Sequence, residues 1–296
     1  MRWWVTLVRT SAKPELARSF SRIHQLLRLE TINLTFVPDN VNYVNVDCGS
    51  RLALQASILG ALADSFSIRA QSKLTSLSLN NLRTWDLTPL ESSPFQAVLK
   101  NLRCLRLSML YEQSTDPVTT SERWSHFWGT LFHHVFLSPT QHTLTELTLE
   151  SDQSIGASSR VSFAELHFPY LCALSLGNII FEPSVESFIL RHASTPVRLK
   201  LSMCVLLPDT NLWLGARPIH WAHIWDNFAV GLTALVALRV DEGGDRSEGR
   251  YVHLDSIQGF YFRKRVPEPI NVVDNAALQR FYETVSARSN QACNTS

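Results

Sequence analysis

The sequence predicts an α/β fold in which one strand–helix unit repeats along a curved parallel sheet, with helices on the convex side. Three observations indicate this fold. A leucine pattern recurs along the 296 residues, and apolar positions at helical spacing lie between its copies. The composition, with 45% hydrophobic and 18% charged residues, supplies enough apolar material for a sizeable core.

The leucine pattern is L-x-x-L-x-L. Its strict copies are LTSLSL at 74–79, LRCLRL at 102–107, LTELTL at 144–149 and LCALSL at 171–176, and looser copies begin at 29, 196 and 235. With 42 leucines in the chain, chance would give roughly one strict copy. Three of the spacings between copies are 28, 27 and 25 residues, within the roughly 20–29 residues of leucine-rich repeats. The pattern therefore predicts an irregular leucine-rich-repeat solenoid.

Each copy of the pattern predicts a short strand. Its last two leucines are two residues apart, so both point to the same face of the strand. One short strand cannot bury that face, and copies that stack side by side build a parallel sheet with a continuous core. Parallel strands need crossover connections, which helices usually provide.

Seven segments have the apolar spacing of such helices. They cover 14–27, 51–66, a short stretch after Ser93-Pro94, 121–137, 184–192, 219–230 and 275–288. The longest aligns Trp124, Phe127, Trp128, Leu131 and Val135 and stops before Pro139; the last one follows Asp274. We expect a single solenoid domain over 1–288 and a disordered tail over 289–296.

Charge and motifs exclude several classes of protein. Because 27 basic residues balance 26 acidic ones, the sequence predicts neither a nucleic-acid-binding nor a polybasic membrane-binding protein. No apolar run approaches the ~18 residues of a membrane span, and the start MRWWVTLVRT lacks a signal-peptide pattern. Five cysteines form no CxxC pair, which argues against a disulfide framework and a zinc site. A cytoplasmic or nuclear location fits these features.

No segment carries a recognisable catalytic motif. HWAHIW at 220–225 places two histidines three residues apart, but no further metal ligands are indicated nearby. His133 and His134 are adjacent and face different directions on a helix, and DEGGDRSEGR at 241–250 matches neither a calcium nor a phosphate loop. We expect no enzyme, cofactor or metal site. A hydrolase with residues scattered along the chain is the remaining alternative, and it would need a perturbed titratable cluster in a pocket.

The candidate binding surface is the concave face of the sheet, where the residues between the leucines point outward. Along the copies these residues are first neutral, then acidic in the fourth and basic in the sixth. The candidate partner-binding residues are Arg106, Glu146, Glu150, Arg198, Lys200 and Arg239. Solenoids commonly bind proteins on this face, and the basic members suit an acidic peptide or a phosphate.

Part of the sequence resembles a known family. The segments HFPYLCALSLGNIIF, VESFILRHASTPVRLKLSMCVLL, PIHWAHIWDNFAVGLTALVALRV and RYVHLDSI resemble the C-terminal leucine-rich region of fungal F-box proteins. The shared features are Phe168-Pro169, Arg191-His192, the Leu199 to Cys204 strand, and the helix with Trp221 and Trp225. The resemblance covers about 165–255 and extends more loosely over 14–150.

The resemblance implies the substrate-recognition repeats of a cullin-type ubiquitin ligase receptor. The alternative is a leucine-rich-repeat scaffold outside ubiquitination. The chain contains no recognisable F-box, and Trp3 and Trp4 lie where a solenoid needs a polar cap. We therefore expect a further segment upstream, and a ligase adaptor would be a partner only through an F-box there.

Overall fold

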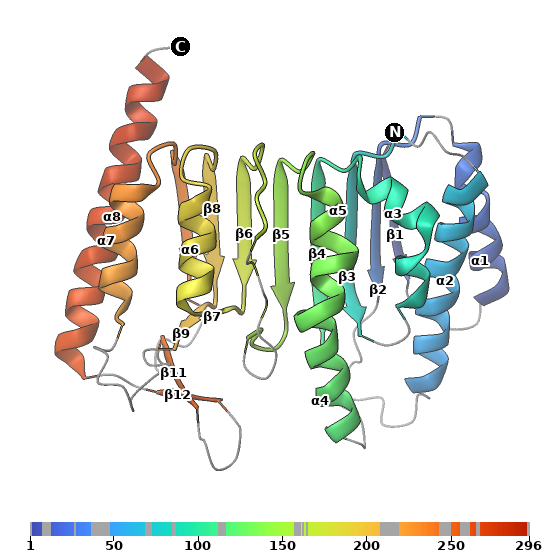
Figure 1. The fold of residues 1–296 in the computed structure, drawn as a ribbon, viewed down its shortest axis with the longest axis horizontal. Coiled ribbons are helices and arrows are strands. Elements are labelled where there is room, and N and C mark those ends of the chain that lie inside the picture. Colours follow the sequence, from blue (N-terminus) through green and yellow to red (C-terminus); the bar gives the residue numbers. More distant parts are fainter. Residues whose placement is uncertain are drawn as a thin grey trace. The chain divides into compact units, whose positions relative to one another are not determined.

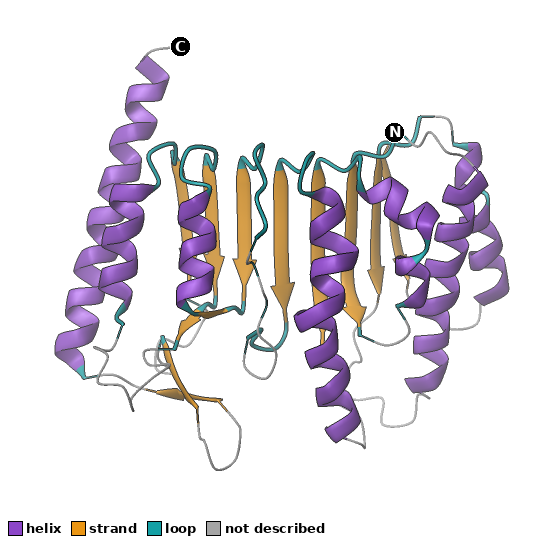
Figure 2. Cartoon of the chain, viewed as in Figure 1, coloured by secondary structure: helices purple, strands orange, loops and turns teal. Residues whose placement is uncertain are grey.

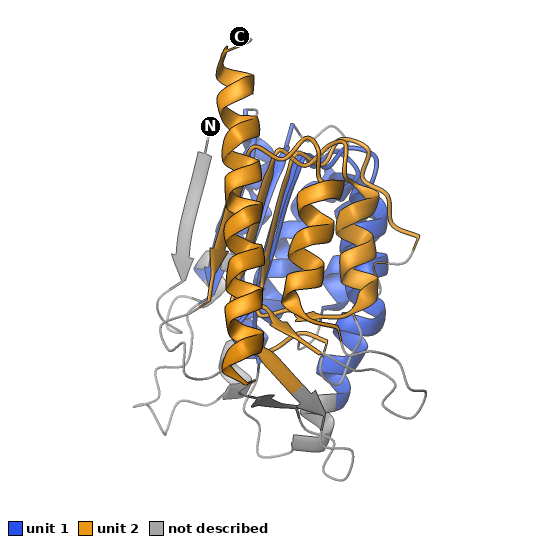
Figure 3. Ribbon diagram, turned by 90° about the vertical axis from the view of Figure 1, so that its left-hand side faces the viewer, with its two compact units in different colours: residues 1–153 blue, residues 154–296 orange. Residues whose placement is uncertain are grey.

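The computed structural model describes residues 2–7, 13–26, 28–36, 48–68, 73–84, 87–111, 117–156, 161, 163, 165–207, 219–242, 250–254, 261–264 and 267–294. The chain divides into two compact units, Met1–Gln153 (unit 1) and Ser154–Ser296 (unit 2) (Figure 3). Each unit combines parallel strands with helices (Figure 2). The predicted α/β class is therefore confirmed.

Unit 1 contains five parallel strands in sequence order. These are β1 (Arg2–Leu7), β2 (Thr31–Phe36), β3 (Ser76–Arg83), β4 (Cys104–Leu110) and β5 (Glu146–Ser151). Each strand pairs with the next one in parallel. Strand β1 was not predicted, because RWWVTL lacks the leucine spacing, yet its backbone pairs with β2 over six positions.

The helices of unit 1 lie on one face of its sheet (Figure 1). They are α1 (Lys13–Ser21), η2 (Ile23–Gln25), α2 (Cys48–Ile68), η3 (Thr88–Glu91), α3 (Ser93–Leu99), α4 (Pro117–His126), η4 (Phe127–Leu137) and α5 (Ser138–Thr140). The predicted apolar faces of 51–66 and of the helix after Ser93 are buried, including Leu59, Leu62, Phe66 and Phe95. The helical spacing of the sequence therefore located these crossovers correctly.

The segment predicted as one α-helix over 121–137 changes type at Phe127. Residues Phe127–Leu137 form a π-helix, in which backbone bonds span five residues instead of four. Phe127, Phe132 and Leu137, five residues apart, are consequently all fully buried. Leu131, which the α-helical spacing placed on the inner face, is only half-buried. That prediction was wrong because the period of this segment is longer than 3.6 residues.

Unit 2 contains three parallel strands in its main sheet, β6 (Ala173–Gly177), β8 (Arg198–Ser202) and β10 (Ala237–Asp241). Helices α6 (Pro183–Arg191) and α7 (Trp221–Gly231) lie on one face of it (Figure 1). A second, smaller sheet was not predicted. It joins β7 (Ile180–Phe181), β9 (Val205–Leu206) and β11 (Tyr251–Leu254) in parallel and adds β12 (Tyr261–Lys264) antiparallel.

The last helix, α8 (Glu268–Asn294), is longer than predicted at both ends. Asp274 was expected to precede the helix, but it lies inside α8 and is fully buried. Residues 289–294, expected in a disordered tail, continue the helix, and no proline or glycine interrupts them. The predicted inner residues Leu278, Phe281 and Val285 are buried, with Phe281 stacked on Trp225 of α7.

The strands follow the leucine pattern closely. In all seven copies, which begin at 29, 74, 102, 144, 171, 196 and 235, the strand begins two residues after the copy does. Three copies also share a backbone feature just after the strand core. The eighth residue of these copies, Asn81, Asn178 or Met203, has a positive φ of 59°, 54° or 53°. This repeated left-handed turn marks one structural unit used several times.

Candidate functional site

The residues between the leucines form what we call the open face, the sheet face opposite the helices. In unit 1 it comprises Thr31, Asn33, Thr35, Ser76, Ser78, Asn80, Cys104, Arg106, Ser108, Glu146, Thr148 and Glu150; in unit 2 it comprises Ala173, Ser175, Gly177, Arg198, Lys200, Ser202, Ala237, Arg239 and Asp241. The alternating apolar residues of β2, β4 and β5 are buried, whereas Leu238 and Val240 of β10 are only half-buried. All six candidate residues predicted from the sequence lie on this face.

The neutral part of the open face in unit 1 is tied together by side-chain hydrogen bonds. The Asn80 Nδ2 donates to Asn33 Oδ1 at 2.8 Å and to Thr35 Oγ1 at 3.2 Å. Ser78 Oγ donates to Asn80 Oδ1 at 3.2 Å. These contacts link β2 and β3 and use much of the hydrogen-bonding capacity of the amides, so this region is preordered.

The charged part of unit 1 lies on β4 and β5. Arg106 pairs with Thr148 across the strands, and its guanidinium lies 3.7 Å from a Glu146 carboxylate oxygen. Glu150 stands opposite Ser108 on the same face. With two carboxylates and one guanidinium, this end of the unit 1 face carries a net negative charge.

The open face of unit 2 is basic. Lys200 of β8 lies in register with Ser175 of β6 and Arg239 of β10, and Arg198 stands one step before Lys200 on the same face. Arg239 is well exposed and has a 4.0 Å contact with Asp241. Like charges directly opposite each other on neighbouring strands destabilise a sheet. The Lys200–Arg239 register therefore places two cations side by side, with Asp241 next to Arg239.

A groove of about 600 Å³ adjoins this face, between the end of β10 and α8. Its lining consists of Arg239, Val240, Asp241, Glu242, Arg250, Asn275, Leu278, Gln279 and Tyr282. Three of these, Asn275, Gln279 and Tyr282, lie along one side of α8 at helical spacing. The groove thus joins one predicted binding residue, Arg239, to a helix that the sequence analysis did not connect with binding.

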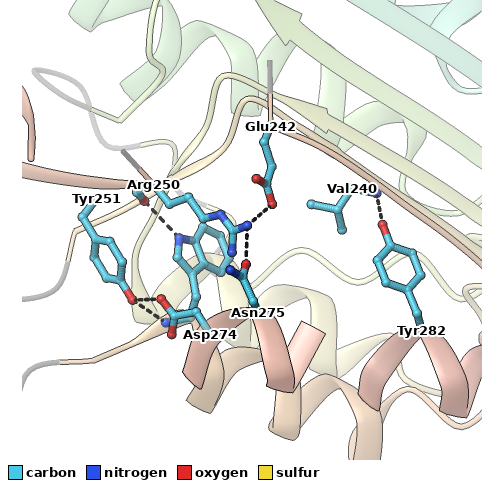
Figure 4. Close-up of polar contacts among 8 residues, drawn as sticks. Val240, Glu242, Arg250, Tyr251, Asp274, Asn275 and Tyr282 are labelled. Carbon is cyan, nitrogen blue, oxygen red and sulfur yellow. Dashed lines mark hydrogen bonds and ion pairs between the residues drawn. The ribbon is translucent and has the colours of Figure 1, made fainter. Parts of the chain in front are cut away.

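Short polar contacts fix the walls of the groove (Figure 4). Arg250 reaches Glu242 at 2.5 Å and donates to Asn275 Oδ1 at 2.7 Å. The Val240 backbone N–H, on the outer edge of β10, donates to the Tyr282 hydroxyl at 3.0 Å. Glu242 and Arg250 are the described ends of the segment DEGGDRSEGR, whose residues 243–249 lie outside the described residues.

A buried tyrosine–carboxylate pair lies beside the groove (Figure 4). The Tyr251 hydroxyl donates to Asp274 Oδ2 at 2.6 Å, while the Ala222 N–H donates to Asp274 Oδ1 at 2.9 Å and the Trp221 N–H to Tyr251 at 3.0 Å. Burial, reinforced by Asp274, raises the pKa of Tyr251 far above its ordinary value. The pair receives the first backbone N–H groups of α7, so it is a helix cap built by β11, which carries Tyr251, and by α8, which carries Asp274.

Other candidates for chemistry have structural partners. His192 is buried, its Nε2 accepts from the Phe168 N–H at 2.9 Å, and its Nδ1 bonds the Phe188 carbonyl at 2.8 Å. Burial lowers the pKa of His192, so the ring is a neutral link between α6 and the segment that precedes β6. Burial also raises the pKa of Cys204 to about 12, which leaves its thiol unreactive.

The histidine pairs do not converge on a metal site. His223 accepts a hydrogen bond from Asn227 at 3.1 Å, and His220 packs edge-on against Tyr251. Within the part of the chain that the structure describes, no group of three histidine, cysteine, aspartate or glutamate side chains is arranged to hold a metal ion. None of the helices described is both long and apolar enough to cross a lipid bilayer.

Sequence reasoning found the strand residues of the site and missed its helical wall. The alternation of the leucines identifies Arg239 as outward, but nothing in it relates β10 to α8. The one available signal was the polar series Asn275, Gln279 and Tyr282, which follows the helical period beside the inner series Leu278, Phe281 and Val285. Neither the known protein-family models nor the curated proteins contain a match to this chain.

Proposed function

We propose that this chain is a leucine-rich-repeat solenoid that binds another protein through the open face of its sheets. The observation that carries the proposal is the register of the open face. Neighbouring strands align residue by residue, so their outward side chains form continuous rows across each unit. Rows of this kind offer a partner an extended surface on a rigid backbone.

The repeated details of the strands support the solenoid. Each leucine copy begins its strand at the same point, and the left-handed residue recurs at the same position in three copies. The short strands β7 and β9 follow β6 and β8 after a turn and pair with each other. A small unit that is used repeatedly is typical of repeat proteins, which bind partners rather than transform substrates.

The role we favour is substrate recognition for a ubiquitin ligase, on the resemblance to fungal F-box proteins over about 165–255. In that role the open face holds the substrate, and a separate F-box holds the adaptor. The second candidate is a scaffold outside ubiquitination. Both share the open face as the binding surface and differ in whether adaptor and cullin accompany the protein.

The test is affinity purification of the C-terminally tagged full chain from its own cells, with quantitative mass spectrometry. We expect specific partners whose recovery falls at least about tenfold when Arg198, Lys200 and Arg239 are all replaced by glutamate. Arg280→Glu is the matched control, because Arg280 is an exposed arginine paired with Asp226, away from the open face. Circular dichroism would establish that both variants remain folded.

The same purification separates the two roles. Recovery of a cullin and its adaptor with the tagged chain supports the ligase receptor. Specific partners without them support the scaffold. If wild type and the folded triple glutamate variant retain the partners equally, the open face of unit 2 is not the binding surface.

A further inference from the structure

We infer that the open face of unit 2 binds an extended acidic segment of the partner protein, which continues into the groove between β10 and α8. This inference rests on the proposed function and adds the chemistry of what is bound. In this inference, Arg198, Lys200 and Arg239 bind the carboxylates of the segment, and Asn275 and Gln279 bind its main chain.

The charge of the face is the first argument. Among the nine open-face positions of unit 2, three are cationic and one, Asp241, is anionic. Lys200 and Arg239 are direct cross-strand partners, and neighbouring strands lie about 4.8 Å apart. Two long cationic side chains at that spacing can both reach one carboxylate. Together with Arg198, they outnumber the one carboxylate of the face, Asp241, so the face is complementary in charge to an acidic segment.

The shape of the face is the second argument. The open-face residues of β6 are alanine, serine and glycine at 173, 175 and 177, so no side chain there stands above the backbone by more than a hydroxyl. Beside this strand, the long side chains of Arg198 and Lys200 on β8 and of Arg239 on β10 are the ones that project toward a partner.

The groove is the third argument. Its volume of about 600 Å³ suits a few peptide residues and is far too small for a folded domain. Side-chain amides both donate and accept hydrogen bonds, so Asn275 and Gln279 on α8 can pair with the main chain of an extended segment. Gln279 Nε2 donates to Glu283 Oε1 at 3.1 Å, which leaves the Gln279 carbonyl oxygen as an acceptor for a main-chain N–H. Arg250 already bonds Asn275 Oδ1, which leaves the Asn275 NH₂ as a donor held in a fixed direction.

The same observations disfavour nucleic acid as the occupant. Duplex binding requires many phosphate contacts along a broad basic surface. Here three cations share the face with Asp241, and Glu242 lies in the adjoining groove. The formal charge of the whole chain is only +1. A short acidic peptide matches the number and the extent of these cations, whereas a long polyanion does not.

The test measures binding of a fluorescein-labelled ten-residue peptide with alternating glutamates to the full-length protein, by fluorescence anisotropy. We expect the glutamate peptide to bind about tenfold more tightly than the same peptide with glutamine, and both salt and Arg239→Gln to weaken it. Lys200→Gln should have the same effect. Arg280→Gln is the matched control, because Arg280 is an exposed arginine of α8 that pairs with Asp226 and does not line the groove, and it should leave binding unchanged.

A groove variant tests the second part of the inference. Gln279→Ala should weaken the glutamate and glutamine peptides equally, since it removes a main-chain contact. Equal affinity for the two peptides, or full binding by Arg239→Gln and Lys200→Gln, would overturn the inference. A single-stranded RNA of equal charge that binds more tightly than the peptide would overturn the choice of occupant.

The outcome also separates this inference from the proposed function. If the triple glutamate variant loses its cellular partners but wild type ignores the acidic peptide, the open face binds proteins of another chemistry. If the variant keeps its partners as well, both the inference and this placement of the binding surface fail.

Discussion

Unit 1 and unit 2 present the same strand positions to the open face but fill them differently. In unit 1 the amides and hydroxyls around Asn80 bond one another, and the charged end is acidic. In unit 2 the face is shorter, its first strand carries only small residues, and its cations stand in register. A shared leucine framework therefore fixes where the side chains point and leaves their chemistry free to vary.

The units also differ in what holds their helices in place. Unit 1 has a π-helix with a cluster of aromatic rings in edge-to-face and tilted contact, among them Phe127, Trp128 and Phe132. Unit 2 uses buried polar groups, Asp274 with Tyr251 and His192 with two backbone groups. Unit 1 also has buried directional bonds, because Gln55 of α2 exchanges two 2.9 Å hydrogen bonds with the Arg83 backbone of β3. The units therefore differ in the π-helical aromatic cluster of unit 1 and in the tyrosine–carboxylate cap of unit 2.

The largest effect is expected from Phe132→Ala in unit 1. Removing this fully buried ring from the aromatic cluster should lower the free energy of unfolding by about 4 kcal/mol. Leu131→Ala is its control and should cost only about 1 kcal/mol, because Leu131 is half-buried in the π-helix. Urea denaturation measures both. A larger loss at Leu131 than at Phe132 would mean that the segment is an ordinary α-helix.

The next effect is expected from Asp274→Ala in unit 2. The change leaves the Ala222 N–H and the Tyr251 hydroxyl without their acceptor and should cost about 3 kcal/mol. Tyr251→Phe keeps the carboxylate and the Ala222 bond but leaves the Trp221 N–H and Asp274 Oδ2 without partners, so its cost should be about 2 kcal/mol. Urea denaturation again measures the losses, and equal small losses in both variants would contradict the capping role.

Measuring stability at different pH values would sharpen the comparison of the two units, because among the described residues only unit 2 has a buried histidine. Burial lowers the pKa of His192, and the stacked His167 and nearby Arg191 act in the same direction. Below the ordinary histidine pKa of about 6.5, the unfolded chain therefore binds the additional proton more readily. The contribution of neutral His192 to the free energy of unfolding is fully present above that pH. It is lost as the pH falls toward the lower pKa that His192 has in the folded protein.

The measurement for His192 is the free energy of unfolding from urea titrations between pH 8 and pH 5. His192→Gln should be less stable than wild type at pH 8, and its deficit should shrink as the pH falls. A deficit that stays constant over this range would show that His192 is not held neutral.

The smallest effect is expected at the repeated left-handed turn. Asparagine occupies this position in two copies, and Met203 occupies it in a third. Because a methionine side chain is disfavoured at positive φ, Met203→Asn should raise the free energy of unfolding by about 0.5–1 kcal/mol. Met203→Val is the opposing control, since a branched Cβ makes this conformation worse. Stabilisation by valine would contradict the turn geometry.

The sequence was most informative where one period governs a segment. Leucines two residues apart located seven strands, and a period near 3.6 located α2, α6 and α7 with their buried residues. It was least informative where the period changes, or where residues that pair in the fold lie far apart in the sequence. The π-helix departs from the assumed period, and β7 and β9 have two residues each, too few to show any alternation.

In the candidate site, too, some residues could be predicted from the sequence period and others could not. Outward residues such as Lys200 and Arg239 follow from strand alternation, and their register follows from the alignment of the leucines. The groove could not be predicted, because it depends on how α8 packs against β10 across a separation of about forty residues, as in the Val240–Tyr282 bond. Asp274 resembled an ordinary helix cap in the sequence, yet it caps a helix 52 residues earlier in the chain.

That distant cap bears on how the protein is made. While the chain leaves the ribosome, Trp221 and Trp225 emerge well before Asp274, Phe281 and Tyr282, which complete the cap of α7, cover Trp225 and occupy the edge of β10. Until α8 has been synthesised, α7 lacks its cap and an apolar surface stays uncovered. A product that ends before α8 would keep that surface exposed, which is the feature that chaperones and quality-control proteases recognise.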